Sequence, residues 1–188
     1  MRLKVFCIMA ALAFSVYCPA QVLPAAQRSR IDLSIGGGMD YWRGDWGQIA
    51  RFGPSAWATA DLWHGLGINA EGHSMIIGGS RASEYKYFVG EGGLIYTYHH
   101  WRSVRPYAKA EVGFGSLSWP HKPTSTYSHD TRTTWALGGG FEYHLWKRVW
   151  ARADYTYDGF PDIYSPITGH HRTLDPAGVA FGATYHFR

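Results

Sequence analysis

Apolar and polar residues alternate one by one along most of this chain, which is the pattern of β-strands and not of helices. The last eleven residues show the alternation best, because one face of this segment carries five apolar side chains: Val179, Phe181, Ala183, Tyr185 and Phe187. The other face carries small or polar residues, with aromatic residues crowding one end of the segment. This arrangement is typical of a strand whose apolar face meets lipid.

Eight alternating segments can be counted in the chain. They cover about Arg30–Trp42, Ser55–Trp63, Gly67–Ile76, Glu84–Tyr98, Arg105–Ser118, Thr133–Leu145, Val149–Tyr157 and Leu174–Phe187. In the fourth segment the run Glu91-Gly92-Gly93 blurs the alternation. We predict a β-bulge at this run, because a bulge inserts one unpaired residue and shifts the side-chain period.

The connections between these segments alternate between short and long. The short ones are His64–Leu66, His99–Val104 and Trp146–Arg148. The long ones are Arg43–Pro54, Ile77–Ser83, Trp119–Arg132 and Asp158–Thr173. Short turns at one end and long loops at the other are typical of up-and-down membrane barrels. The chain is therefore predicted to be all-β, an eight-stranded antiparallel up-and-down transmembrane β-barrel with four external loops.

Alternation alone does not separate a membrane barrel from a soluble sheet with one solvated face, so the polar face has to decide. That face carries ionisable residues on several strands: Asp61, Glu71, His73, Lys109, Glu111, Glu142, His144, Arg152 and Asp154. An eight-stranded barrel has an interior just wide enough for side chains, and charges enclosed there have to be paired. We predict an interior charge network with Lys109 and Arg152 as its main cations, close to Glu71 and Glu142. The alternative is that these residues form the solvated face of an open sheet.

The chain is rich in glycine and aromatic residues, with 23 Gly, 9 Trp, 13 Tyr and 9 Phe. Tryptophan and tyrosine favour membrane interfaces, and two aromatic girdles are expected. The girdle near the short turns would contain Trp63, Tyr98, Trp101, Trp146 and Trp150. The girdle near the loops would contain Tyr41, Trp42, Trp57, Trp119, Tyr155 and Tyr157.

The first 20 residues are expected to be a secretory signal peptide. Arg2 and Lys4 precede an apolar run of 13 residues, Val5–Tyr17, and small residues follow. Cleavage is predicted after Ala20, with Ala26 as the alternative. Residues 21–29 then form a short lead to a barrel domain at 30–188. Both cysteines lie inside the signal, so the mature chain would have no disulfide and no thiol chemistry.

The net charge of +4 overstates the basic character of the mature chain. Without Arg2 and Lys4, the 18 basic residues become 16 against 14 acidic ones, and no basic run exceeds two residues. Nucleic-acid binding therefore has no electrostatic basis here. Beyond the signal, no apolar stretch approaches the roughly 18 residues that a membrane-spanning helix needs.

The segments Pro106–Gly115, Ala136–Tyr143 and Arg152–Tyr157, together with the signal and the eight strands, resemble the small outer-membrane β-barrel proteins of the OmpA/OmpX type. The chain is most similar to the porin-like single-domain branch, which lacks a peptidoglycan-binding tail. The closing Tyr185 and Phe187 resemble the assembly signal that the barrel-assembly machinery reads, although this chain ends in Arg188 instead of an aromatic residue. The resemblance implies an integral protein of a bacterial outer membrane, exported through the periplasm, monomeric, and in contact with outer-membrane lipids and lipopolysaccharide.

Three functions are compatible with such a barrel. The first is a structural or surface-interaction role, adhesin-like or ligand-binding, with an unknown external ligand on the loops and no catalysis. The second is a narrow porin-like channel for small solutes, which the filled interior of eight strands disfavours. The third is an outer-membrane lipid-modifying enzyme, but the chain has no His-x-Ser pair on a strand face. We expect no cofactor and no metal, because the adjacent pairs His99-His100 and His170-His171 would point to opposite faces of a strand.

Overall fold

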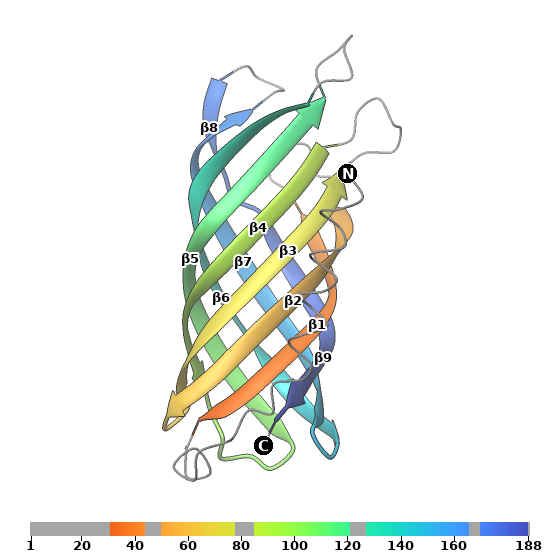
Figure 1. Ribbon diagram of the computed structural model, residues 1–188, viewed down its shortest axis with the longest axis vertical. Coiled ribbons are helices and arrows are strands. Elements are labelled where there is room, and N and C mark those ends of the chain that lie inside the picture. The colour runs from red at the N-terminus through yellow and green to blue at the C-terminus, as the bar shows by residue number, and fades with distance from the viewer. Residues whose placement is uncertain (1–30, 44–49, 78–84, 121–126, 166–169, 188) are drawn as a thin grey trace, which may run out of the picture. The chain divides into compact units, whose positions relative to one another are not determined.

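The alternating segments form a closed antiparallel β-barrel. The computed structural model describes residues 31–43, 50–77, 85–120, 127–165 and 170–187. The strands are β1 (Asp32–Arg43), β2 (Ala50–Trp63), β3 (Leu66–Ile77), β4 (Tyr85–Thr97), β5 (Val104–Pro120), β6 (Tyr127–Trp146), β7 (Val149–Ser165), β8 (His170–Leu174) and β9 (Ala177–His186). They wind around the barrel with a pronounced tilt (Figure 1). The predicted signal and lead, residues 1–29, lie outside the described residues.

Eight strands close the ring. Each of β1 to β7 pairs with the next strand along the chain, and β9 joins the two ends by pairing with both β1 and β7. Closure gives each of these eight strands a hydrogen-bonded neighbour on both sides, as a span through lipid requires. The predicted eight-stranded antiparallel up-and-down barrel is confirmed. The ninth strand, β8, pairs only with the end of β7 among the described strands.

The two ends of the barrel differ in their connections. One end carries the connections between β2 and β3, β4 and β5, and β6 and β7, and we call it the short-turn end; the opposite end is the loop end. The turn between β2 and β3 has two residues with positive φ, 50° at His64 and 86° at Gly65, as tight hairpins require. A Cβ on Gly65 would lie 2.1 Å from the carbonyl oxygen of Thr97, so only glycine fits there.

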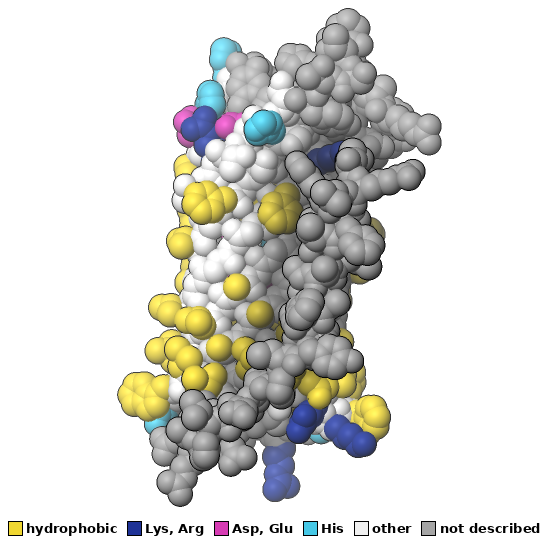
Figure 2. Space-filling model, viewed as in Figure 1, with side chains coloured by type: hydrophobic (Ala, Val, Ile, Leu, Met, Phe, Trp, Pro, Cys, Tyr) yellow, Lys and Arg dark blue, Asp and Glu magenta, His cyan; other side chains and the backbone are white. Residues whose placement is uncertain are grey.

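The outer wall is apolar, as the alternation predicts. The exposed positions of β1 are apolar or glycine up to the rim, including Leu33 at 49% and Ile35 at 53% exposure. Hydrophobic side chains are spread over the visible wall, and charged and histidine side chains lie toward the two ends (Figure 2). No helix in the described part of the chain has the length and apolar character of a membrane span.

The bulge predicted at Glu91-Gly92-Gly93 is wrong. The register of β4 runs through these residues without a shift on both sides, against β3 and against β5. The outward positions on either side of Glu91 are glycines, Gly90 and Gly92, which have no side chain. The alternation of inward and outward positions is therefore intact, although no apolar side chain marks the outer face. Register shifts occur instead near the short-turn end, between Asp61 and Trp63 and between His144 and Trp146, and again in the β7–β8 pairing.

Two of the predicted loops are largely strand. The pairing of β5 with β6 continues to Pro120 opposite Tyr127, inside the predicted loop Trp119–Arg132. The predicted loop Asp158–Thr173 contains the end of β7 and most of β8, which form a second hairpin. Strands that rise into water need no apolar face, so these extensions lack the alternation that marks the rest. The predicted strand Leu174–Phe187 is interrupted at Asp175-Pro176, where the Asp158 amide donates to the Pro176 carbonyl at 2.9 Å.

Three tryptophans assigned to the girdles lie inside the barrel instead. Trp42, Trp57 and Trp150 are only 3%, 4% and 6% exposed. Each occupies an inward position of its strand, two residues from another inward residue: Asp40 for Trp42, Thr59 for Trp57 and Arg152 for Trp150. Position in the period therefore overrides the general preference of tryptophan for interfaces. The outward aromatic residues are exposed as predicted: Trp63, Tyr98, Trp101 and Trp146 near the short turns, and Tyr41 and Tyr155 near the loops. The Trp119 side chain lies outside the described part.

Candidate functional site: the barrel interior

Lys109 lies at the centre of a cluster of ionisable side chains inside the barrel. Its side chain is fully buried, and its ammonium contacts Glu71 Oε1 directly. The same ammonium lies 3.5 Å from Glu111 Oε2 and 4.0 Å from Asp154 Oδ1. One cation from β5 therefore faces three carboxylates from β3, β5 and β7, which partly offsets the loss of hydration of all four groups.

Arg152 is the second cation of the cluster. Its Nε donates to Asp154 Oδ2 at 2.9 Å, and one terminal nitrogen lies 3.4 Å from Glu71 Oε2. The guanidinium also lies over two aromatic rings, 4.6 Å from the Trp57 centroid and 4.7 Å from that of Tyr107. These cation–π contacts explain why a tryptophan occupies an inward position, because a desolvated guanidinium gains from a ring face.

Polar side chains extend the cluster along β3 on both sides of Glu71. His73 lies 2.5 Å from Asp40 Oδ2 through Nδ1 and 3.1 Å from Glu71 Oε1 through Nε2. Asn69 donates to Glu71 Oε2 at 3.1 Å and to Glu111 Oε1 at 2.8 Å. The amide thus bridges two carboxylates that would otherwise repel each other.

The structure brings together six of the nine residues predicted for the network: Glu71, His73, Lys109, Glu111, Arg152 and Asp154. Glu142 is buried opposite Arg152 in the register, but within the described residues its carboxylate pairs with His186, 3.0 Å from Nε2, instead of with Arg152 or Lys109. Asp61 pairs with His99 at 3.1 Å near the short-turn end. His144 is only half-buried and its Nε2 lies 3.0 Å from the Lys147 carbonyl oxygen, so it does not belong to the network.

Among the described residues, four buried acidic or histidine residues are absent from the predicted set: Asp40, Glu91, Asp158 and His186. Glu91 lies in the run where a bulge is predicted, and Asp158 lies in a segment predicted to be a loop. Strict alternation would have found both, because Glu91 continues the inward positions Ile95 and Gly93, and Asp158 continues Asp154 and Thr156.

An apolar layer lies between the charge network and the loop end. It consists of seven buried side chains: Trp42, Met75, Tyr87, Val89, Leu117, Phe160 and Leu174. Phe160 and Val89 have no exposed surface, and the rings of Phe160 and Tyr87 lie 5.5 Å apart. Within the described residues these side chains form one buried apolar cluster below the external hairpins.

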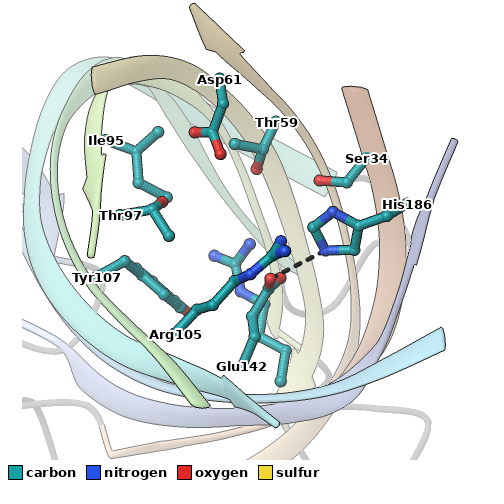
Figure 3. A pocket seen from close by; sticks show the side chains of 10 residues that line it. Ser34, Thr59, Asp61, Ile95, Thr97, Arg105, Tyr107, Glu142 and His186 are labelled. Carbon is teal, nitrogen blue, oxygen red and sulfur yellow. Dashed lines mark hydrogen bonds and ion pairs between the residues drawn. The ribbon is translucent and has the colours of Figure 1, made fainter. Parts of the chain in front are cut away.

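A small polar pocket lies at the short-turn end (Figure 3). It encloses about 280 Å³ of empty space, including the part open to solvent, and Asp61, Arg105, Glu142 and His186 are among the residues that line it. Figure 3 shows the Glu142 and His186 side chains pointing toward each other across one side of this pocket. The barrel interior is therefore layered, with a polar mouth, a charged middle and an apolar layer toward the loop end.

An apolar outer wall around a closed ring of strands, with paired charges inside, defines the class of transmembrane β-barrel proteins. The chain belongs to the outer membrane protein beta-barrel domain family, whose model matches residues 9–187. The family and the similar structures are proteins of bacterial outer membranes.

Solved structures share this fold at low sequence identity. Neisserial surface protein A (NspA) is 14% identical over 82% of this chain and 96% of its own, with a TM-score of 0.65. Ail, the attachment invasion locus protein of Yersinia pestis, is 16% identical over 84% of this chain and 97% of its own, with a TM-score of 0.56. A major outer membrane protein from Thermus thermophilus is 14% identical over 84% of this chain and 100% of its own, with a TM-score of 0.55. No curated protein matches the chain.

Proposed function

We propose that this protein is an integral outer-membrane barrel whose function is structural or surface-interacting, carried by its loop end, and that it catalyses no reaction. The filled interior carries this proposal. An apolar layer lies above a charge network, and a barrel of eight strands has no spare width for an aqueous channel. What the protein does therefore has to involve its ends or its outer wall.

The loop end is built to present side chains to the outside. The β5–β6 and β7–β8 hairpins both extend beyond the closed ring, because β6 and β7 pair with each other only up to Trp135 opposite Gly159. Arg132 on one hairpin pairs with Asp130 at 3.1 Å and lies 4.0 Å from Asp162 on the other. Rigid scaffolds that carry exposed polar segments commonly place binding there.

The export route and the partners follow from the same proposal. The chain would cross the periplasm unfolded, insert with the barrel-assembly machinery and remain a monomer among outer-membrane lipids and lipopolysaccharide. Tyr185 and Phe187 are the proposed assembly signal, and both rings are exposed on the outer wall at the end of the chain, 5.2 Å apart.

A binding experiment tests the surface role. One solved structure of Ail holds the heparin analogue sucrose octasulfate, which makes a sulfated glycan a reasonable first probe of the loop end. We expect calorimetric titration of the refolded barrel with sucrose octasulfate, and separately with lipopolysaccharide, to detect binding to at least one of them. The Arg132→Ala variant should weaken that binding several-fold. Arg148→Ala removes an exposed arginine at the short-turn end and serves as the control, which should leave binding unchanged.

The channel alternative predicts a different result. Large, stable conductance steps in a planar bilayer would show a continuous aqueous path and would contradict the proposal. Equal binding of both probes by wild type, Arg132→Ala and Arg148→Ala would show that the loop end does not recognise them.

A further inference from the structure

Three buried glutamates from neighbouring strands converge inside the barrel. Glu71 on β3 lies directly opposite Glu91 on β4 in the register, and Glu111 on β5 lies opposite Gly93, two residues further along β4. One carboxylate oxygen of each lies within 4.8 Å of the other two. The three residues are 7%, 5% and 3% exposed. Like charges directly opposite each other destabilise a sheet, so something has to compensate this arrangement.

The described interior has fewer cations than carboxylates. Seven buried residues carry a carboxylate: Asp40, Glu71, Glu91, Glu111, Glu142, Asp154 and Asp158. Against them stand two buried permanent cations, Lys109 and Arg152, and two buried histidines, His73 and His186. Lys109 pairs with Glu71 and lies near Glu111, whereas no basic nitrogen of the described residues lies within 4.0 Å of a Glu91 oxygen.

The hydrogen bonds also show that Glu91 lacks a positive partner. Glu91 Oε1 accepts from the Thr134 hydroxyl at 3.0 Å, which fixes the carboxylate. Glu91 Oε2 is fully buried and has no hydrogen-bond partner among the described residues, and the same holds for Glu111 Oε2. A buried oxygen without a partner is costly, so Glu91 Oε2 has capacity for a further positive group, and Glu111 Oε2 has the Lys109 ammonium at 3.5 Å but no hydrogen bond.

We propose that Glu71, Glu91 and Glu111 bind one divalent cation of the hard, oxygen-seeking class, with Ca²⁺ the best fit. Three oxygens no more than 4.8 Å apart can all lie about 2.8 Å or less from one central point, close to the 2.3–2.6 Å of calcium–oxygen bonds. Mg²⁺ needs about 2.0–2.1 Å in strict octahedral geometry, so it would require the glutamates to move further inward.

The neighbouring charges allow this occupancy. Lys109 faces the site from β5, and Asp154, 4.0 Å from its ammonium, gives it an alternative partner when a cation takes up Glu71 and Glu111. Arg152 and His73 also lie near Glu71, at 3.4 Å and 3.1 Å, and each has a second carboxylate partner, Asp154 for Arg152 and Asp40 for His73. A bound cation would tie β3, β4 and β5 together just below the apolar layer.

The experiment uses the full-length protein extracted from membranes in detergent, stripped with EDTA and then equilibrated with Ca²⁺ or with Mg²⁺. Atomic spectroscopy after desalting should find about one Ca²⁺ per barrel, and Ca²⁺ should raise the urea midpoint of unfolding, because binding to the folded state alone stabilises it. In the Glu91→Gln variant both the bound Ca²⁺ and the rise in midpoint should be lost. Asp130→Asn removes a carboxylate from the external β6 segment and should retain both.

Two outcomes overturn the proposal. Wild-type protein that retains no Ca²⁺ and gains no stability from it would show that Glu91 is neutralised by a proton instead. Calcium retained equally by wild type and Glu91→Gln would place the ion elsewhere. If Glu91→Gln does not fold, the wild-type calcium content and the difference between Ca²⁺ and Mg²⁺ in its unfolding midpoint decide the matter.

Discussion

The Lys109→Met substitution is the sharpest test of the interior charge network. Methionine keeps most of the length and volume of the lysine side chain and removes only its charge. The side chain of Lys109 is fully buried between Glu71, Glu111 and Asp154, so the variant leaves carboxylates that lose a cation and gain no water.

The contacts that the carboxylates keep in Lys109→Met decide how much stability the variant loses. Breaking a buried ion pair by removing one partner destabilises a protein by about 3–5 kcal/mol. Glu71 would still have Arg152 at 3.4 Å and His73 at 3.1 Å, and Asp154 would still have Arg152 at 2.9 Å. Of the contacts described for its side chain, Glu111 would keep the hydrogen bond from the Asn69 amide at 2.8 Å. We therefore expect a loss near the lower end of that range, about 3 kcal/mol.

Urea unfolding of the barrel in detergent measures this loss, with EDTA present so that no divalent cation replaces the ammonium. Tryptophan fluorescence and the migration of unheated samples on gels report the folded fraction, and linear extrapolation gives the free energy of unfolding. The double variant Lys109→Met/Glu111→Gln is the matched control. It should be more stable than Lys109→Met by about 1–3 kcal/mol, because it removes the carboxylate that the single change leaves without a cation.

A loss below about 1 kcal/mol would refute the reasoning, because that is the value of a solvent-exposed pair. A double variant less stable than Lys109→Met would refute it as well. It would show that Glu111 needs its charge for a reason other than Lys109.

Two further substitutions test the apolar layer and the outer wall. Gly115→Ala should destabilise the barrel by about 1–3 kcal/mol in the same assay, because the new Cβ would lie 1.8 Å from a ring carbon of the buried Phe160. Gly90→Ala is the control and should be neutral, because its Cβ meets nothing closer than 3.9 Å. Equal effects of the two substitutions would contradict the packing of Phe160 against Gly115. Leu137→Arg places a charge on the wall, where Leu137 is 55% exposed, and should destabilise the lipid-embedded barrel by about 2–4 kcal/mol. Thr133→Arg lies on the same face, beyond the outward Trp135, and should change the free energy of unfolding by about 1 kcal/mol or less. A similar loss in both variants would argue against a lipid-facing band that contains Leu137 and ends before Thr133.

The sequence alone predicted most of the barrel, because a period of two is a local property. Each residue needs only its neighbours two positions away to be assigned a face, and the assignments of Leu33, Glu71, Lys109 and Arg152 agree with the structure. The same rule applied without exception places Trp57 inside. The error there came from using a residue type's general preference against its position in the period.

The strand ends could not be predicted in the same way. Above the membrane both faces of a hairpin are solvated, so the apolar marker disappears although pairing continues, as between Ser116 and Thr131. Glu91 was missed for a related reason, since the outward positions beside it are glycines with no side chain to mark the outer face.

The partners of the interior charges depend on ring closure, which no local pattern encodes. Glu142 and Arg152 are direct neighbours in the register, and a pairing between them is the natural expectation. The closed barrel instead offers Glu142 the imidazole of His186 at 3.0 Å, and it offers Arg152 the Glu71 carboxylate from β3, 81 residues away in the chain. Those long-range contacts form only when β9 has joined β1 and β7. The interior charges therefore stabilise the closed ring and not any isolated hairpin. In an open sheet with the same register, Glu71 and Glu91 would lie opposite each other in water, where their repulsion costs little. In the closed barrel the two carboxylates are buried, so closure is stable only when the charge network compensates them.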